Sequence, residues 1–122
     1  MKIARFEDIA CWKDARNIVK HIYKLCNMSS FKKDFSLADQ TKRSAISIMA
    51  NIAEGFTRKS NREFIQYLFI AKSSAAELQS HLYIALDQKY LSTQEFQQLY
   101  TELDLVQRKI SSFIKYLRTT LK

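Results

Sequence analysis

The sequence contains a single glycine and no proline among its 122 residues. All-β architectures need both residue types in the many turns between their strands. The shortage therefore argues against a turn-rich β fold and favours a few long helices. Hydrophobic residues make up 47% of the chain and charged residues 26%. This balance suits one hydrophobic core, so we expect a single domain over residues 1–122.

Long hydrophobic runs are also missing, because even the run at residues 67–71, which no other run exceeds, is far too short to cross a bilayer. Three of the first seven residues are charged, and no apolar leader segment follows them. Cys11 and Cys26 fall on one predicted helix, where about 22 Å of rise between them excludes a disulfide. Two reduced thiols and no leader segment lead us to expect a cytoplasmic protein.

Acidic residues are few relative to basic ones. The chain has 20 Lys and Arg against 12 Asp and Glu, which gives a formal net charge of +8. Such a charge indicates an anionic partner, with nucleic acid first and a membrane surface second. A solvated basic face that only aids solubility is the alternative. Residues 1–35 carry a net +4, residues 36–60 carry +2, residues 61–91 are neutral, and residues 92–122 carry +2.

The sequence does contain apolar residues at a helical period. Three Ser-x-x-Asp or Ser-x-x-Glu segments, beginning at Ser36, Ser60 and Ser92, match the capping box that starts a helix. They divide the chain into four predicted helices, at about Glu7–Met28, Leu37–Glu54, Asn61–Lys89 and Thr93–Leu121. Short connections make successive helices antiparallel neighbours. We therefore predict an all-α, up-down-up-down four-helix bundle.

Each predicted helix has an apolar stripe with steps of three and four residues, which suits bundle packing. The first helix contributes Trp12, Ala15, Val19, Ile22 and Cys26. The second contributes Ala45, Ile48 and Ile52. The third contributes Phe64, Leu68, Ala71, Ala75, Leu78, Leu82 and Ala85. The last contributes Phe96, Leu99, Leu103, Val106, Ile110, Phe113 and Leu117.

The segment 51–64, which holds the only glycine, has two interpretations. In the first, Gly55 adopts a left-handed conformation just past the second helix and Ser60 caps the third. In the second, Arg58, Lys59 and Arg62 form an exposed basic corner that contacts phosphate.

Other cations share helical faces, because successive residues turn by about 100°. On the first helix, four cations lie opposite the apolar stripe: Lys13, Arg16, Lys20 and Lys24. On the last helix, another four lie away from the core: Arg108, Lys115, Arg118 and Lys122. We predict that these faces and the basic corner bind nucleic acid through phosphate.

The third predicted helix carries five apolar residues outside its core stripe: Ile65, Phe69, Ile70, Tyr83 and Ile84. A helix that is apolar nearly all round is buried on more than one side. We therefore predict a subunit interface there. The alternative is that this helix lies deepest within the monomer.

Residues for catalysis or metal binding are sparse. Neither His21 nor His81 has a His, Cys or carboxylate four residues later, so we expect no metal site and no cofactor. Arg16 and His21 match the Arg-x(4–6)-His spacing of helical ribonucleases. However, five residues on a straight helix place the two side chains about 140° apart. We expect no enzymatic activity, with a ribonuclease as the less favoured alternative.

The run D-Q-x-x-R-x-A-x-S-I-x-x-N-I-A-E-G at residues 39–55 resembles the central motif of a known family. This family is the small four-helix-bundle proteins encoded in intervening sequences of bacterial 23S rRNA genes. Similar residues extend from Phe6 to Leu91. The resemblance implies a homopentamer with a basic surface or channel. Relatives include the accessory protein of diversity-generating retroelements, which binds a reverse transcriptase and nucleic acid.

Two functions follow from these observations. The first is a non-enzymatic oligomer that binds RNA or an RNA–DNA hybrid, with a reverse transcriptase as a partner. The second is a structural or protein-interaction scaffold with no nucleic-acid role. Neither requires a membrane or a small-molecule substrate.

Overall fold

A computed structural model describes residues 3–120 of the chain. Every regular element in that range is helical, which confirms the all-α prediction. The elements are the 3₁₀ turn η1 (Phe6–Asp8) and the helices α1 (Ala10–Cys26), α2 (Ser29–Lys33), α3 (Phe35–Phe56), α4 (Asn61–Asp87) and α5 (Thr93–Thr119). The short helix α2 was not expected. The predicted end of the last helix, near Leu121, lies outside the described residues.

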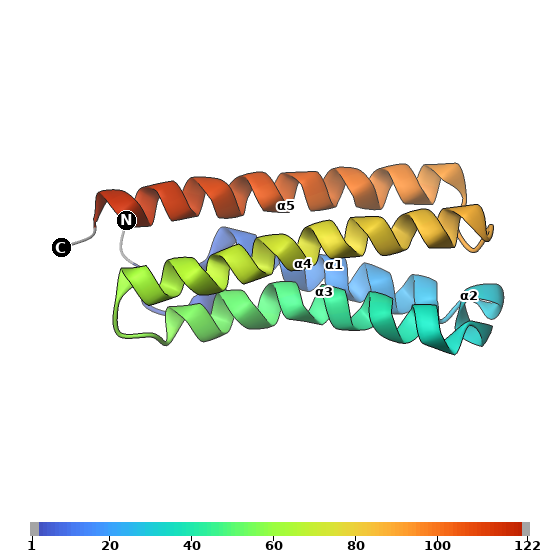
Figure 1. The fold of residues 1–122 in the computed structure, drawn as a ribbon, viewed down its shortest axis with the longest axis horizontal. Coiled ribbons are helices and arrows are strands. Elements are labelled where there is room, and N and C mark those ends of the chain that lie inside the picture. The colour runs from blue at the N-terminus through green and yellow to red at the C-terminus, as the bar shows by residue number, and fades with distance from the viewer. Residues whose placement is uncertain (1–2, 121–122) are drawn as a thin grey trace.

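The four long helices lie side by side, and each packs against two of the others (Figure 1). Helix α1 contacts α3 and α5, and α4 contacts the same two helices. Polar contacts join the far ends of neighbouring helices: Asp14 of α1 meets Lys109 of α5 at 2.6 Å, and Asn61 of α4 meets Thr120 after α5 at 2.8 Å. Helix α5 therefore runs opposite to α1 and α4, because residues near the start of each of these two helices meet residues near the end of α5.

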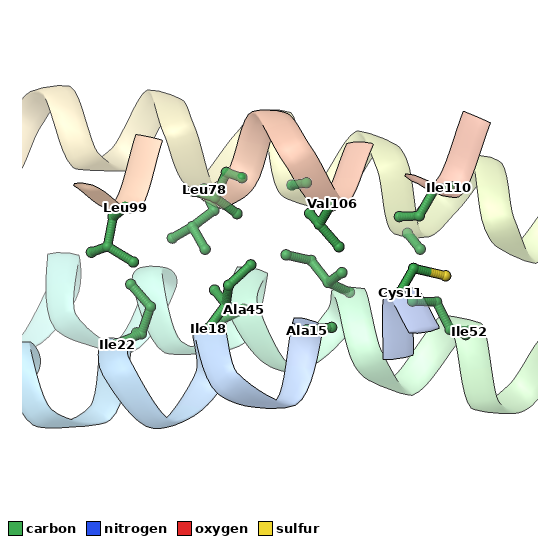
Figure 2. Close-up of a cluster of buried hydrophobic side chains, with 14 of the residues drawn as sticks. Cys11, Ala15, Ile18, Ile22, Ala45, Ile52, Leu78, Leu99, Val106 and Ile110 are labelled. Atoms are coloured by element: carbon green, nitrogen blue, oxygen red, sulfur yellow. The ribbon is translucent and has the colours of Figure 1, made fainter. Parts of the chain in front are cut away.

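The core lies along the axis of this bundle, where side chains of the four long helices point toward one another (Figure 2). The predicted stripe of α5 is buried except at Phe113, which is half-buried. On α1 the stripe is wider than predicted, because Ile18 and Leu25 are also buried and Val19 is half-buried. A helix packed between two neighbours buries a face about 100° wide or more, which includes residues beside the main stripe.

The helix caps agree with the sequence at two positions of three. Ser92 forms a full capping box with Glu95, and the Ser60 hydroxyl accepts the Glu63 N–H at 3.2 Å. The prediction for Ser36 is wrong. Helix α3 begins earlier, and Asp34 is the N-cap, since its Oδ1 accepts the Leu37 N–H at 3.1 Å. Aspartate caps as well as serine does, so the motif alone could not choose between them.

The start of the first helix also differs from the prediction. Residues 6–8 form only a 3₁₀ turn, and Ile9 is extended, with φ −76° and ψ 123°. The extended residue separates this turn from α1, which begins at Ala10 instead of Glu7. Phe6 nevertheless packs on the bundle, because its ring lies edge-on to Trp12 with centroids 5.1 Å apart.

Gly55 does not end its helix in a left-handed conformation, so that prediction is wrong. It is buried inside α3 and has no positive φ. A Cβ atom at this position would lie 2.7 Å from Cδ1 of Phe64 and 2.8 Å from Cβ of Tyr67. Glycine is therefore needed for the close approach of α3 to the first turns of α4, and the helix ends at Phe56.

Replacing Gly55 with alanine is expected to lower the free energy of unfolding by about 1–3 kcal/mol, the usual cost of overpacking. In an uncrowded helix interior the same change would stabilise by about 1 kcal/mol. Urea unfolding measures the difference, with Ser73→Ala on the exposed face of α4 as a control expected to stay within about 0.5 kcal/mol. A Gly55→Ala protein more stable than the wild type would contradict the close approach.

The caps can be compared by a matched pair of substitutions. Asp34→Ala removes the acceptor of the Leu37 N–H and of the Tyr90 O–H, which is 2.9 Å from Asp34 Oδ2. We expect a loss of about 1–3 kcal/mol in the free energy of unfolding. Ser36→Ala, two residues later, should change it by less than about 0.5 kcal/mol. A larger loss for Ser36→Ala in the same urea titration would restore Ser36 as the cap.

Candidate nucleic-acid interface

The basic stripe of α1 consists of Lys13, Arg16, Lys20 and Lys24. All four side chains are exposed. None of them forms an ion pair with any residue between positions 3 and 120. They face solvent because the buried residues of α1, among them Ile18 and Ile22, hold the opposite side of the helix against the core. From Lys13 to Lys24 the stripe extends over about 16 Å.

The other polar residues of α1 lie at its edge with α5. Asp14 Oδ2 is 2.6 Å from Lys109 Nζ, and His21 Nδ1 is 3.7 Å from Oε1 of Glu102. The one carboxylate of α1 is therefore paired away from the stripe. The outward face of this helix presents cations without a neutralising acid on the same helix.

The basic corner after α3 is less uniform than the sequence suggested. Arg58 Nη2 is 2.9 Å from Glu54 Oε2 and also donates to the Tyr67 hydroxyl, and its guanidinium lies 4.7 Å from the centroid of the Tyr67 ring. It therefore braces the α3–α4 connection. Lys59 and Arg62 are exposed and form no ion pair with a described residue.

The cations of α5 are exposed at Arg108, Lys115 and Arg118. The Arg118 guanidinium lies 5.7 Å from the centroid of the Phe69 ring on α4, a cation–π contact. Lys122, predicted on the same face, lies outside the described residues. Arg108 and Lys115 form no ion pair within residues 3–120.

The outer face of α4 exposes four of the five predicted interface residues. Phe69, Ile70, Tyr83 and Ile84 are between 43% and 49% exposed. Ile65 is only 7% exposed, so it belongs to the core and its assignment to the surface is corrected. Its position on α4 turns it toward the neighbouring helices, which the apolar pattern of one helix could not show. These four exposed apolar side chains lie on a helix with a small net charge of −1, from two basic and three acidic residues.

Sequence reasoning missed three lysines near the C-terminal end of α1. Lys32 and Lys33 are exposed on the unexpected helix α2, and Lys42 of α3 places its Nζ 5.1 Å from the centroid of the Tyr23 ring. Adjacent lysines at 32 and 33 were the available signal. They fell in a segment that the cap pattern had assigned to a loop.

The described residues offer little for catalysis. Burial raises the pKa of the Cys11 thiol to about 12 and that of Cys26 to about 11, so neither thiol ionises at neutral pH. Arg16 points to solvent while His21 faces Glu102 on α5, so the two sit on different sides of α1. No three His, Cys, Asp or Glu side chains within residues 3–120 are placed to hold a metal ion.

The run at 39–55 that carries the family resemblance has a structural role between α3 and α4. The Ser47 hydroxyl lies 2.8 Å from that of Ser74, and the Asn51 amide donates to Ser47 Oγ at 3.0 Å. Ser44 donates to Glu77 Oε1 at 3.1 Å. Together with the bare backbone at Gly55, these contacts fix the packing of two helices.

Residues 3–120 thus form a small all-α bundle with an unneutralised cationic face. Comparison with known families agrees with the sequence resemblance: a model of the 23S rRNA-intervening sequence protein matches residues 7–112, and the chain belongs to this family. Within the described part of the chain, no helix has the length and apolar character needed to cross a membrane.

The fold recurs in a solved structure. A 1.70 Å crystal structure of a protein with unknown function from the S23 ribosomal protein family of Bacteroides thetaiotaomicron VPI-5482 is similar, with a TM-score of 0.80. The two are 24% identical, and the match covers 86% of this chain and 95% of that chain. A comparison with curated proteins finds no significant match.

Proposed function

We propose that this protein is a non-enzymatic nucleic-acid-binding protein that holds RNA or an RNA–DNA hybrid through its phosphates. The observation that carries the proposal is the α1 stripe, with four exposed cations and no ion pair to a described residue. An unpaired surface Lys or Arg keeps its full charge available for phosphate. Contacts of this kind position the ligand without reading its sequence.

We further propose that copies of this chain assemble through the apolar face of α4, and family resemblance suggests five copies. Phe69, Ile70, Tyr83 and Ile84 leave apolar surface in water that association would remove. Residues 61–91 carry no net charge, so this face can approach a second copy without strong repulsion. An assembly presents several α1 stripes at once, which raises avidity for one long polyanion.

A protein partner is the second candidate, and the same α4 face supports it. The face could seat another protein, such as a reverse transcriptase, in place of a second copy of this chain. A scaffold of this kind would co-purify with its partner and have no affinity for RNA alone. The ribonuclease alternative has weaker support, because Arg16 and His21 do not converge on one side of α1.

Charge reversal distinguishes the faces. The triple change Lys13→Glu, Lys20→Glu, Lys24→Glu is expected to weaken RNA binding about tenfold or more and to reduce the slope of log affinity against log salt by about three. Fluorescence anisotropy with a labelled RNA between 50 and 200 mM salt measures both. The charge-matched control is Lys59→Glu, Arg108→Glu, Lys115→Glu, which alters three exposed cations elsewhere.

Equal losses in the two triple variants would show that net charge, and not the α1 face, governs binding. Wild-type affinity that does not change with salt would reject phosphate contact altogether. RNA cleavage by the pure protein that disappears in His21→Ala would favour the ribonuclease instead.

Assembly is tested by introducing a charge into the α4 face. Phe69→Glu places a carboxylate where we expect apolar contact, and native mass measurement should then show monomers in place of the wild-type oligomer. The control Ile46→Glu changes an apolar residue of similar exposure on α3 and should leave the oligomer intact. A monomeric wild type at micromolar concentration would contradict this interface.

A further inference from the structure

The turn between α1 and α3 holds an aromatic side chain that packing does not explain. Helix α2 is anchored by Phe31, which is buried and stacks on Tyr90 with ring centroids 5.2 Å apart. Phe35, at the first position of α3, instead points outward and is 79% exposed. This is the highest exposure of any large hydrophobic residue between positions 3 and 120. Its ring adds little to the core, so another role is indicated.

Phe35 stands between two hollows that are both lined by lysine. One, of about 600 Å³, has Lys32 and Lys42 in its wall together with Asp39. The other, of about 480 Å³, is lined by Lys32 and Lys33. Phe35 and Lys32 line both hollows, so the exposed ring shares each of them with lysine side chains.

The acids of this corner have partners of their own. Asp34 caps α3 and accepts the Tyr90 hydroxyl, and Asp39 Oδ2 is 2.8 Å from Nε of Arg43. Between positions 20 and 43 the chain has six Lys or Arg and two Asp. The corner therefore has a positive net charge, and its lysines form no ion pair with a described residue.

The corner is continuous with the stripe on α1. Lys42 Nζ lies over the ring of Tyr23, which is 45% exposed and sits on α1 between Lys20 and Lys24. Helix α2, which carries Lys32 and Lys33, lies at one end of the bundle, next to the end of α1 (Figure 1). A groove that combines cations with exposed aromatic rings is typical of proteins that bind single strands.

We infer that Phe35 is a stacking platform for an unpaired base of a single-stranded nucleic acid, whose flanking phosphates contact Lys32, Lys33 and Lys42. This inference rests on the proposed function and adds the state of the ligand. A duplex keeps its base faces inside the stack, so it cannot cover the Phe35 ring. A flexible strand can follow the side of α1 and turn over the end of the bundle.

An anionic membrane would also attract an aromatic ring beside lysines. A flat bilayer cannot contact the end of the bundle and the side of α1 at once. The two cationic regions together therefore favour a strand.

The test compares ligands with and without bases. Anisotropy is measured with a 20-nucleotide oligo-dT, an oligo-rU of the same length, and a 20-unit abasic strand that keeps the phosphates. Phe35→Leu removes the aromatic face and keeps an apolar side chain, while Phe35→Tyr keeps the ring. We expect Phe35→Leu to weaken binding to the base-bearing strands about 5- to 100-fold, and to leave the abasic strand unchanged.

Phe35→Tyr should bind like the wild type. Ile46→Ala, which trims an exposed apolar residue on α3, is the control for nonspecific loss. A second readout is the tryptophan fluorescence of Phe35→Trp. The only native tryptophan, Trp12, is 9% exposed. Oligo-dT should therefore quench the fluorescence of the added surface indole, and the abasic strand should not. Unequal losses on oligo-dT and oligo-rU show which sugar the strand carries, and a loss on either supports stacking.

Several outcomes would overturn the inference. If Phe35→Leu binds all strands like the wild type while the α1 triple variant loses affinity, stacking is wrong and phosphate binding stands. If the wild type binds none of these strands but binds an RNA–DNA hybrid, stacking is wrong and the proposed function stands; if it binds neither, both proposals fail. If Phe35→Leu loses affinity only for phosphatidylserine-containing vesicles, the corner contacts a membrane.

Discussion

The burial of apolar stripes from α1, α3, α4 and α5 against one another decides which residues reach solvent. Once Ile18 and Ile22 point to the core, the cations of α1 can only point outward, because the helical period leaves them no other direction. The same rotation sends Asp14 to the α5 edge, where Lys109 pairs with it. The cationic face is thus a by-product of core packing. This face can attract an anion because it carries no acidic residue that would neutralise its cations.

The α3–α4 contact shows a different constraint, in which two helices approach too closely for an ordinary side chain. Gly55 supplies space for the Phe64 ring, and Asn51 and Ser47, one and two turns earlier, replace apolar contact with hydrogen bonds. Small polar residues allow backbones to come near while still satisfying their own donors and acceptors. The residues that carry the family resemblance therefore hold the bundle together. A ligand site has to be sought elsewhere on the surface.

How far the sequence could predict this structure depends on the range of each interaction. Helix period and the Ser60 and Ser92 caps are local, so the four long helices were predictable. Gly55 was misassigned because its reason lies on another helix, at Phe64, and no local pattern shows that distance. For the same reason, Ile65 was assigned to the surface and Ile18 was left out of the predicted core stripe. At Lys89, φ is 62°, a value that glycine adopts more easily. The scarcity of glycine in the sequence therefore does not exclude a left-handed backbone conformation. Part of the candidate site was predictable, because the cations of the α1 stripe follow the helical period. The corner around Phe35 follows no such pattern and was not predicted.

The separation of charge from apolar surface bears on how one small chain could do two tasks. The stripe on α1 and the apolar face of α4 lie on helices that each pack mainly on α3 and α5. Association through α4 would therefore leave α1 open to a polyanion in every copy. Repulsion between copies grows with the square of the charge brought together, so a contact helix with a net charge of only −1 and distant cations reduce this repulsion. A polyanion bound across the α1 stripes of several copies would reduce the repulsion between copies further. Binding and assembly would then favour each other.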